Sequence, residues 1–241
     1  YCSSWTFYGA VGSAAQDLLS YLPIYLGPVL LFVFATGMLE RLTRVAKANN
    51  ITSIADFIGS RFGKSHALAA LVTVIAVTAA IPYIALQFKA VALSIDVLSR
   101  GAVTHERVDL WNDSALYVAL LLALFAILFG TRRIDATEHH HGMMLAIAVE
   151  SVVKLVAFVA VAMYAQSLPD VVDSGVGKLA EELAASGLPP GFVAQTLLAF
   201  TAMFCLPRQF HVGVVECEDV RDLRHARWMF PAYLLIICML V

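Results

Sequence analysis

Apolar residues fill long, nearly unbroken blocks of this chain, a pattern typical of membrane-spanning helices rather than of strands or amphipathic soluble helices. The two longest blocks, 18–39 and 67–88, each hold 22 residues without a formal charge. A helix of that length can cross a hydrocarbon core of roughly 30 Å. Further apolar blocks, shorter or carrying single charges, follow at 114–131, 143–166, 192–206 and 228–241. We therefore expect an all-α, polytopic membrane helix bundle.

Composition supports the same class of protein. Hydrophobic residues make up 60% and charged residues 14% of the 241 residues, and the mean hydropathy is +0.80, well outside the range of an ordinary soluble domain. The chain opens at Tyr1 with neither an initiator Met nor the basic region of a signal peptide, and the last apolar block runs to Val241. We expect a single transmembrane domain, residues 1–241, truncated at both ends. It should hold about seven spans, with the opening stretch as the tail of the first.

Loop charges predict the orientation of the spans, because Lys and Arg near span ends favour the cytoplasmic side. Segments 40–64, 131–141 and 207–227 hold 11 of the 16 Lys and Arg residues, whereas the alternate loops hold three. Every second loop is therefore expected in the cytoplasm, and the first span should run from inside to outside. We expect a multi-pass protein of the cell inner (plasma) membrane. Its expected partners are the lipid bilayer and a small-molecule solute, with no nucleic acid.

Cysteine and histidine patterns disfavour disulfides, metal sites and catalysis. The four cysteines form no C-x-x-C pair and lie in or near spans or in a loop assigned to the cytoplasm, so a disulfide framework is not expected. The run EHHHG at 138–142 sends its three histidines to different faces of a helix and has no second cluster, which favours a solvated loop over a metal site. No Ser, His and Asp residues stand in a nucleophile-elbow context, so we expect this chain not to be an enzyme.

The opening stretch SSWTFYGAVG, residues 3–12, places three hydroxyls and two glycines where a spanning helix should be. The hydroxyls of Ser3, Ser4 and Thr6 can satisfy carbonyls freed by a helix break. Such breaks are tolerated in lipid only where they line a cavity or are buried in protein, and secondary transporters build solute and ion sites from them. Small residues also form the packing face of ordinary membrane helices, and the pattern of this stretch alone does not choose between the two.

A second break is predicted at the end of the block 192–206, in FCLPRQFHV, where Pro207 follows an aromatic and a thiol residue. By the loop charges this span runs from outside to inside, opposite to the first. If the first five spans and the spans from the sixth onward are inverted copies, the first and sixth are equivalent, and both carry helix-breaking residues. This order along the chain favours a break in the opening stretch and is typical of the inverted five-helix repeat of secondary transporters.

Glu150 and Lys154 are ionisable residues inside the block 143–166, where an unpaired charge is costly and a functional role is the default hypothesis. Their spacing of four places them on one helix face with the acid first, the favoured order for an ion pair. They are either a self-contained structural pair or part of a route for a permeating or coupling ion.

Aromatic and amide side chains mark two further helix faces. Tyr83 and Gln87 are four residues apart in an otherwise aliphatic block, so they can either contact a ligand in a central cavity or hydrogen-bond a neighbouring helix. Phe200 and Phe204 share a face in the same way. Such a pair suits a lid over a solute, although packing is its commoner use.

Several stretches resemble the sodium/solute symporter family, whose core is a five-plus-five inverted repeat of the LeuT type. SSWTFYGAVG resembles the first core helix of that family, NITSIADFIGSRFG (50–63) its cytoplasmic loop, and LPRQFHV (206–212) the end of its sixth core helix. The resemblance covers essentially the whole chain, from the first to the seventh core helix. GTRRIDATEHHHGMMLAIAVESVVKL and LPRQFHVGVVE look most like the transporter-like N-terminal region of CbrA-type sensor histidine kinases.

This resemblance implies roles for residues of the opening stretch. In the family, backbone carbonyls of the unwound first helix hold a sodium ion, which here points to Cys2 and the adjoining Ser3; the other half of that site lies on the eighth core helix. Thr6 falls at a position that faces substrate in sugar-carrying relatives, and Tyr25 falls opposite it. Tyr1 is a departure, because proline symporters carry an Asp there that matters for sodium.

The resemblance also bears on the charged pair and on the overall function. The family places an acidic residue where Glu150 stands, along the inner ion route, which groups Glu150 and Lys154 with the ion-coupling residues. It implies a secondary active, cation-coupled symporter of a small polar solute such as an amino acid, with Na⁺ as the candidate coupling ion and no other cofactor. The alternative is a solute-sensing input domain of a membrane histidine kinase, with a fused kinase region beyond Val241 and a response regulator as partners.

Overall fold

The computed structural model describes residues 2–4, 6–17, 19–100, 114–130, 141–168, 181, 183–185 and 187–241, and the regular structure of these residues is helical throughout. In chain order the helices, with η marking π-helices, are η1 (Thr6–Ala10), α1 (Val11–Gln16), α2 (Leu22–Phe34), α3 (Thr36–Ala48), α4 (Ile54–Arg61), α5 (His66–Arg100), α6 (Ser114–Phe125), η3 (Ala126–Gly130), α7 (His141–Gln166), α9 (Phe192–Cys205), α10 (Pro207–Phe210), η4 (His211–Val215) and α11 (Asp222–Leu240). The expected all-α class is confirmed for this part of the chain.

Two helices, α5 and α7, are each long and apolar enough to cross a membrane alone. Two bent pairs, α2 with α3 and α9 with α10 and η4, raise the number of candidate spans among the described residues to as many as four. The predicted blocks 67–88 and 143–166 are therefore confirmed as continuous helices. The larger number of about seven spans, and the inverted five-helix repeat, stay predictions.

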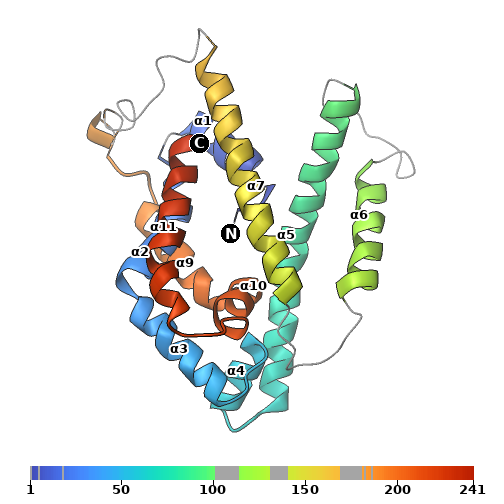
Figure 1. Ribbon diagram of the computed structural model, residues 1–241, viewed down its shortest axis with the longest axis vertical. Coiled ribbons are helices and arrows are strands. Elements are labelled where there is room, and N and C mark those ends of the chain that lie inside the picture. The colour runs from blue at the N-terminus through green and yellow to red at the C-terminus, as the bar shows by residue number, and fades with distance from the viewer. Residues whose placement is uncertain are drawn as a thin grey trace.

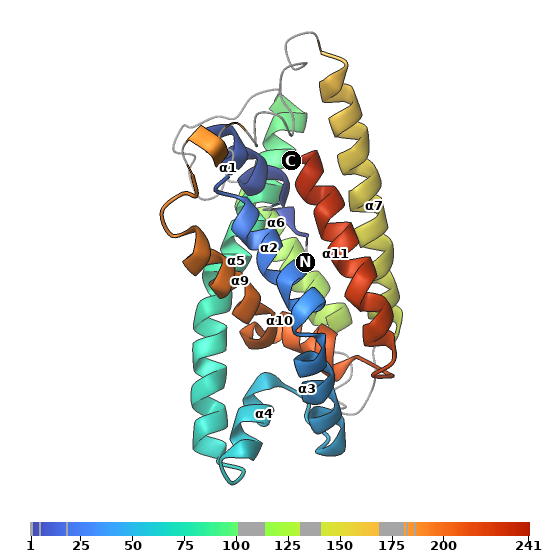
Figure 2. The ribbon, with the colours of Figure 1, turned by 90° about the vertical axis from the view of Figure 1, so that its left-hand side faces the viewer.

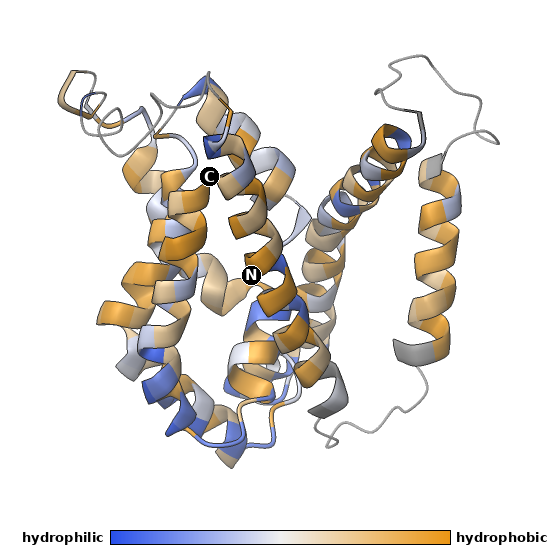
Figure 3. Ribbon diagram, turned by 45° about the horizontal axis from the view of Figure 1, so that its top comes forward, coloured by the Kyte–Doolittle hydropathy of each residue, from blue (hydrophilic) through white to orange (hydrophobic). Residues whose placement is uncertain are grey.

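The apolar block 18–39 does not form the single straight helix that its composition suggests. Its two parts, α2 and α3, meet at Ala35 and diverge by 77°. Buried Leu39, Thr43 and Ala46 recur every three or four residues along α3, while its Arg and Lys side chains are exposed, and Figure 3 shows hydrophilic residues gathering on this helix. An apolar stripe with a basic opposite face suits a helix lying at a membrane surface better than one crossing the core.

The helix α2 packs against both α9 and α11 (Figures 1 and 2). A glycine makes the contact with α9 close. A Cβ atom on Gly27 would lie 2.5 Å from the Phe200 backbone nitrogen and 2.6 Å from the Ala199 Cβ, distances that atoms in a well-packed interior do not adopt. The contact between α2 and α9 therefore needs glycine at this position.

The predicted break at Pro207 is present, whereas the break predicted in the opening stretch stays a prediction, because the described residues there show only a non-helical start and a π-helical turn. At the start of the chain Cys2 and Ser3 are not helical, and the next turn is the π-helix η1; π-helical turns frequently occur at functional sites. At the second break Leu206 adopts an extended conformation (φ −73°, ψ 125°) before Pro207, and the axis turns by 56°. In Figure 1 the N-terminal end lies near the middle of the molecule, close to α7 and α11.

Candidate functional site

A cavity of about 610 Å³ lies where the opening segment (Cys2 to Ala10) meets α5, α7, α11 and the elbow formed by α10 and η4. Its volume falls within the roughly 300–1,000 Å³ of small-molecule sites. Polar side chains reach it from four parts of the chain: Ser3, Ser4, Thr6, Tyr83, Gln87, Glu150, Ser151, Lys154, Arg208 and Gln209. The non-helical residues Cys2 and Ser3 and the elbow after Leu206 both contribute to the lining, and irregular backbone is tolerated in a membrane where it lines a cavity.

Seven of the ten site residues suggested by the sequence line this cavity: Cys2, Ser3, Thr6, Tyr83, Gln87, Glu150 and Lys154. The other three lie elsewhere. Tyr25 is 1% exposed and packs with Tyr21 and residues of α11, while Phe200 and Phe204 pack against the core beneath α2, with their ring centroids 6.1 Å apart. No part of the described structure brings these three to the cavity, and their predicted contact with a solute stays a prediction.

The opening segment satisfies much of its own backbone. The Thr6 backbone N–H donates to the Ser3 carbonyl (3.0 Å), and the Ser3 N–H donates to the Thr6 hydroxyl oxygen (3.3 Å). Thr6 is only 6% exposed. Its hydroxyl therefore shapes the non-helical turn, in addition to bordering the cavity.

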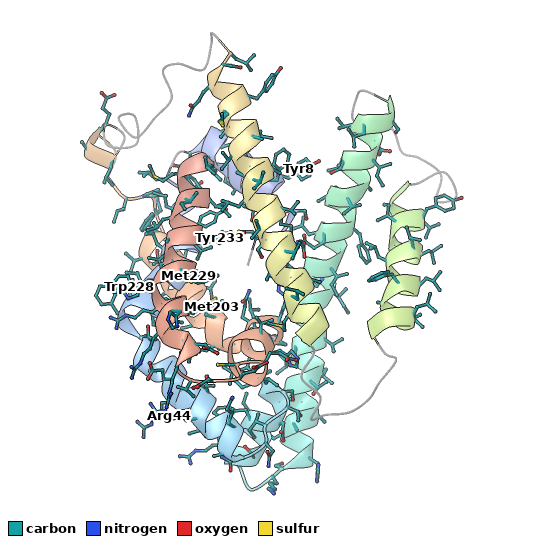
Figure 4. The ribbon with its side chains drawn as sticks, viewed as in Figure 1. Tyr8, Arg44, Met203, Trp228, Met229 and Tyr233 are labelled. Atoms are coloured by element: carbon teal, nitrogen blue, oxygen red, sulfur yellow. The ribbon has the colours of Figure 1, made fainter. Side chains whose placement is uncertain are left out.

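Two side-chain hydrogen bonds tie the opening segment to α5. The Ser4 hydroxyl donates to Gln87 Oε1, and the Tyr8 and Ser94 hydroxyls share a hydrogen bond of 2.6 Å; Figure 4 shows Tyr8 between α7 and α5. The second amide atom of Gln87, Nε2, is buried and has no acceptor among the described residues. A buried donor without a partner costs about 1–3 kcal/mol, so Gln87 offers a ligand a donor that is not already used.

The charged pair predicted on α7 faces this cavity and contacts the opening segment. Lys154 Nζ forms an ion pair with Glu150 and donates a hydrogen bond of 3.1 Å to the Cys2 carbonyl. The Lys154 and Glu150 side chains keep exposed fractions of 39% and 58%. They are therefore not sealed inside helix packing, and the ammonium joins α7 to the first non-helical residues of the chain.

Arg208 is a cavity residue that the sequence analysis assigned to topology alone, because it was counted among the cytoplasmic loop cations. Its guanidinium lies over the Tyr83 ring at 5.4 Å and donates to the Tyr83 hydroxyl (3.1 Å). It has no carboxylate partner within the described part of the chain. With Lys154 and Glu150 it gives the lining two cations and one anion. Its place directly after the helix-breaking Pro207 is the sequence signal that could have identified it.

Metal-binding clusters of three or more His, Cys, Asp or Glu residues are absent from the described residues. The predicted solvated loop EHHHG lies largely outside these residues, since only 141 and 142 are described. The predicted cytoplasmic and external loops at 101–113, 131–140 and 169–180 lie outside them as well.

The amino-acid sequence of this chain is similar to that of a protein described as an uncharacterized symporter, YodF, of Bacillus subtilis (strain 168). It is 31% identical to this chain over 104 residues, which is 43% of this chain and 20% of the relative. The chain thus spans about a fifth of the length of the curated relative that it matches. No family model matches the chain, and no solved structure matches it. Together, the apolar helices and the similarity to a symporter indicate a membrane protein with a distant relationship to symporters.

Proposed function

We propose that this chain is the solute-binding part of a secondary active transporter, a cation-coupled symporter that moves a small polar solute such as an amino acid by alternating access. The observation that carries the proposal is the position of the cavity between the non-helical start of the opening segment and the elbow at Leu206. A short non-helical segment can change direction without disrupting a packed helix, so the walls at these two places can move separately.

The chemistry of the lining supports a solute that carries a carboxylate. The Arg208 guanidinium is planar, and its free N–H groups suit the two oxygens of a carboxylate. Gln87 Nε2 supplies a second donor. Glu150 and Ser151 line the same cavity and provide acceptors for an amino group. This set of donors and acceptors fits an amino acid better than an uncharged sugar.

The sensor alternative uses the same cavity. A solute-sensing input domain would bind the solute but need not move it, so net uptake separates the two functions. Binding and transport must therefore be measured on the same preparation of the full-length protein.

The test is uptake of a panel of ¹⁴C-labelled amino acids by the full-length protein in proteoliposomes with an imposed cation gradient. Arg208→Gln should weaken binding of a transported amino acid about ten- to hundredfold, because a hydrogen bond to a charged group contributes about 1.5–3 kcal/mol. The matched control is Arg221→Gln, an exposed residue outside the cavity whose guanidinium lies 4.0 Å from Asp219 Oδ2 and whose backbone hydrogen bond to Asp219 (2.8 Å) the substitution leaves in place. Equal affinities of the Arg208 variant and the control would contradict the proposed site. Binding without uptake would favour the sensor.

A further inference from the structure

The resemblance to sodium symporters raises the question of whether the opening segment can hold Na⁺. Such a site needs several oxygen atoms that are free to turn toward one ion, because hard cations are bound by shells of oxygen ligands. The described residues offer the Cys2 and Ser3 carbonyls and the hydroxyls of Ser3, Ser4 and Thr6. The partners of these atoms decide whether the site fits a metal ion.

Most of these oxygens already have partners. The Ser3 carbonyl accepts from the Thr6 N–H, and the Thr6 hydroxyl oxygen accepts from the Ser3 N–H. The Ser4 hydroxyl is turned toward Gln87 on α5. The Cys2 carbonyl, which the resemblance assigns to sodium, accepts from the Lys154 ammonium at 3.1 Å. The arrangement of the described residues therefore does not fit a bound Na⁺.

The group that contacts the Cys2 carbonyl is itself a cation. Lys154 Nζ carries one positive charge, donates to this carbonyl and pairs with Glu150, so it makes the contacts to oxygen that a bound cation would make. A second cation beside it would meet like-charge repulsion and would have to compete for the same two oxygen atoms. Unlike a metal ion, the ammonium is attached to α7 and cannot dissociate.

We propose that the Lys154 ammonium is a built-in cation of the opening segment, holding Cys2 against α7 in place of Na⁺. The inference rests on the proposed function only in that both concern the same cavity. It predicts that the opening segment keeps its contact with α7 whether or not Na⁺ is present. Any coupling cation must then act elsewhere than on the Cys2 carbonyl.

The first experiment measures binding of ²²Na⁺ alone to the purified full-length protein by scintillation proximity. Lys154→Met removes the charge and keeps most of the side-chain length, and it should bind one more Na⁺ per protein than the unmodified chain. Adding Glu150→Gln should abolish that extra site, because the carboxylate oxygen is one of its ligands. Lys89→Met, on α5 and outside the cavity, is the matched control and should bind no extra Na⁺. Equal Na⁺ stoichiometry in a monodisperse Lys154→Met protein and the unmodified protein would overturn the proposal, as would loss of Na⁺ from the Glu150→Gln single variant.

A second measurement needs no variant and stays informative if Lys154→Met does not fold. The rate at which N-ethylmaleimide alkylates Cys2 is followed by peptide mass spectrometry in NaCl and in KCl. The two rates should be equal, since the cation that holds this segment is part of the chain. Slower alkylation in NaCl would show that Na⁺ orders the segment and would refute the inference. Both readouts are independent of solute uptake, so a failure of the proposed transport function would leave them unchanged.

Discussion

Neutralising Glu150 and Lys154, singly and together, separates a structural ion pair from an ion route. Water-exposed pairs four residues apart on a helix contribute about 0.3–0.5 kcal/mol, the value expected where water fills the cavity that Glu150 and Lys154 line; their side chains are 58% and 39% exposed. Glu150→Gln should therefore lower the free energy of unfolding by only about 0.5 kcal/mol. Lys154→Met also loses the hydrogen bond to the Cys2 carbonyl. A hydrogen bond from a partly exposed charged donor contributes about 1.5 kcal/mol, so the free energy of unfolding of this variant should fall by that much more.

The measurement is the thermal unfolding midpoint of the full-length protein in detergent. Glu40→Gln with Arg44→Met is the matched control, because these residues form an i,i+4 pair on α3 outside the cavity (3.6 Å). A sealed structural pair would behave differently: each single change would cost about 3–5 kcal/mol by leaving an uncompensated charge, and the double change would restore stability. That pattern would refute the expectation that the ion pair between Glu150 and Lys154 contributes only weakly to stability.

Transport by the double variant tests the ion route itself. If Glu150 lies on that route, the Glu150→Gln, Lys154→Met protein should fold and bind solute but fail to accumulate it in proteoliposomes. Stability and coupling would then respond differently to the same change. Concentrative uptake at the level of the unmodified protein would end the ion-route hypothesis.

Four further outcomes are expected. Thr6→Val should weaken solute binding by about 1 kcal/mol and also loosen the opening turn, whereas Thr6→Ser, which keeps the hydroxyl, should do neither; weaker binding by Thr6→Ser than by Thr6→Val would point to packing of the methyl group instead. Gly27→Ala should lower stability by about 1–3 kcal/mol through overpacking against α9, and a neutral result in thermal unfolding would contradict the close contact. Cysteines introduced at Ser53 and Ser174, in a background without native cysteines, should react with an impermeant reagent from opposite sides of the membrane; equal labelling of both from outside would contradict the predicted topology. Burial raises the pKa of the Cys217 thiol above its usual range, so its alkylation should require higher pH than that of a free thiol, and a midpoint at or below the ordinary thiol value would disprove this.

Local sequence features predicted those parts of the site that depend on neighbours along the chain. Tyr83 with Gln87, and Glu150 with Lys154, share a helix face because their spacing is four, and each pair does line the cavity. The break at Pro207 was predictable from the restrictions that proline places on the residue before it.

Features that depend on distant partners were not predictable. The bend at Ala35 falls inside an apolar block, seven residues after Pro28 and two residues before Gly37, so no proline stands at the bend itself. Beside it the Val33 carbonyl, in the last turn of α2, accepts from the Arg227 guanidinium of α11 at 3.0 Å, a contact between residues 194 positions apart in sequence. The resemblance suggested that Tyr25 is a site residue. Tyr25 is instead buried against α11, a contact that the sequence around Tyr25 does not indicate.

Three bent or non-helical places among the described residues share one feature, a long basic side chain from a distant helix that donates to the backbone at or beside them. Lys154 donates to the Cys2 carbonyl, Arg227 to Val33 beside the bend, and Lys47 to the Glu218 carbonyl just after η4. A buried carbonyl without a partner is costly, which applies most to the part-buried contact at Cys2, since the contacts at Val33 and Glu218 are exposed. A single charged hydrogen bond contributes only about 1.5–3 kcal/mol, which a ligand favouring one arrangement about tenfold to a hundredfold can offset. Each of these three contacts is therefore weak enough for a ligand-sized change in free energy to release it, a property that the proposed alternating access would use.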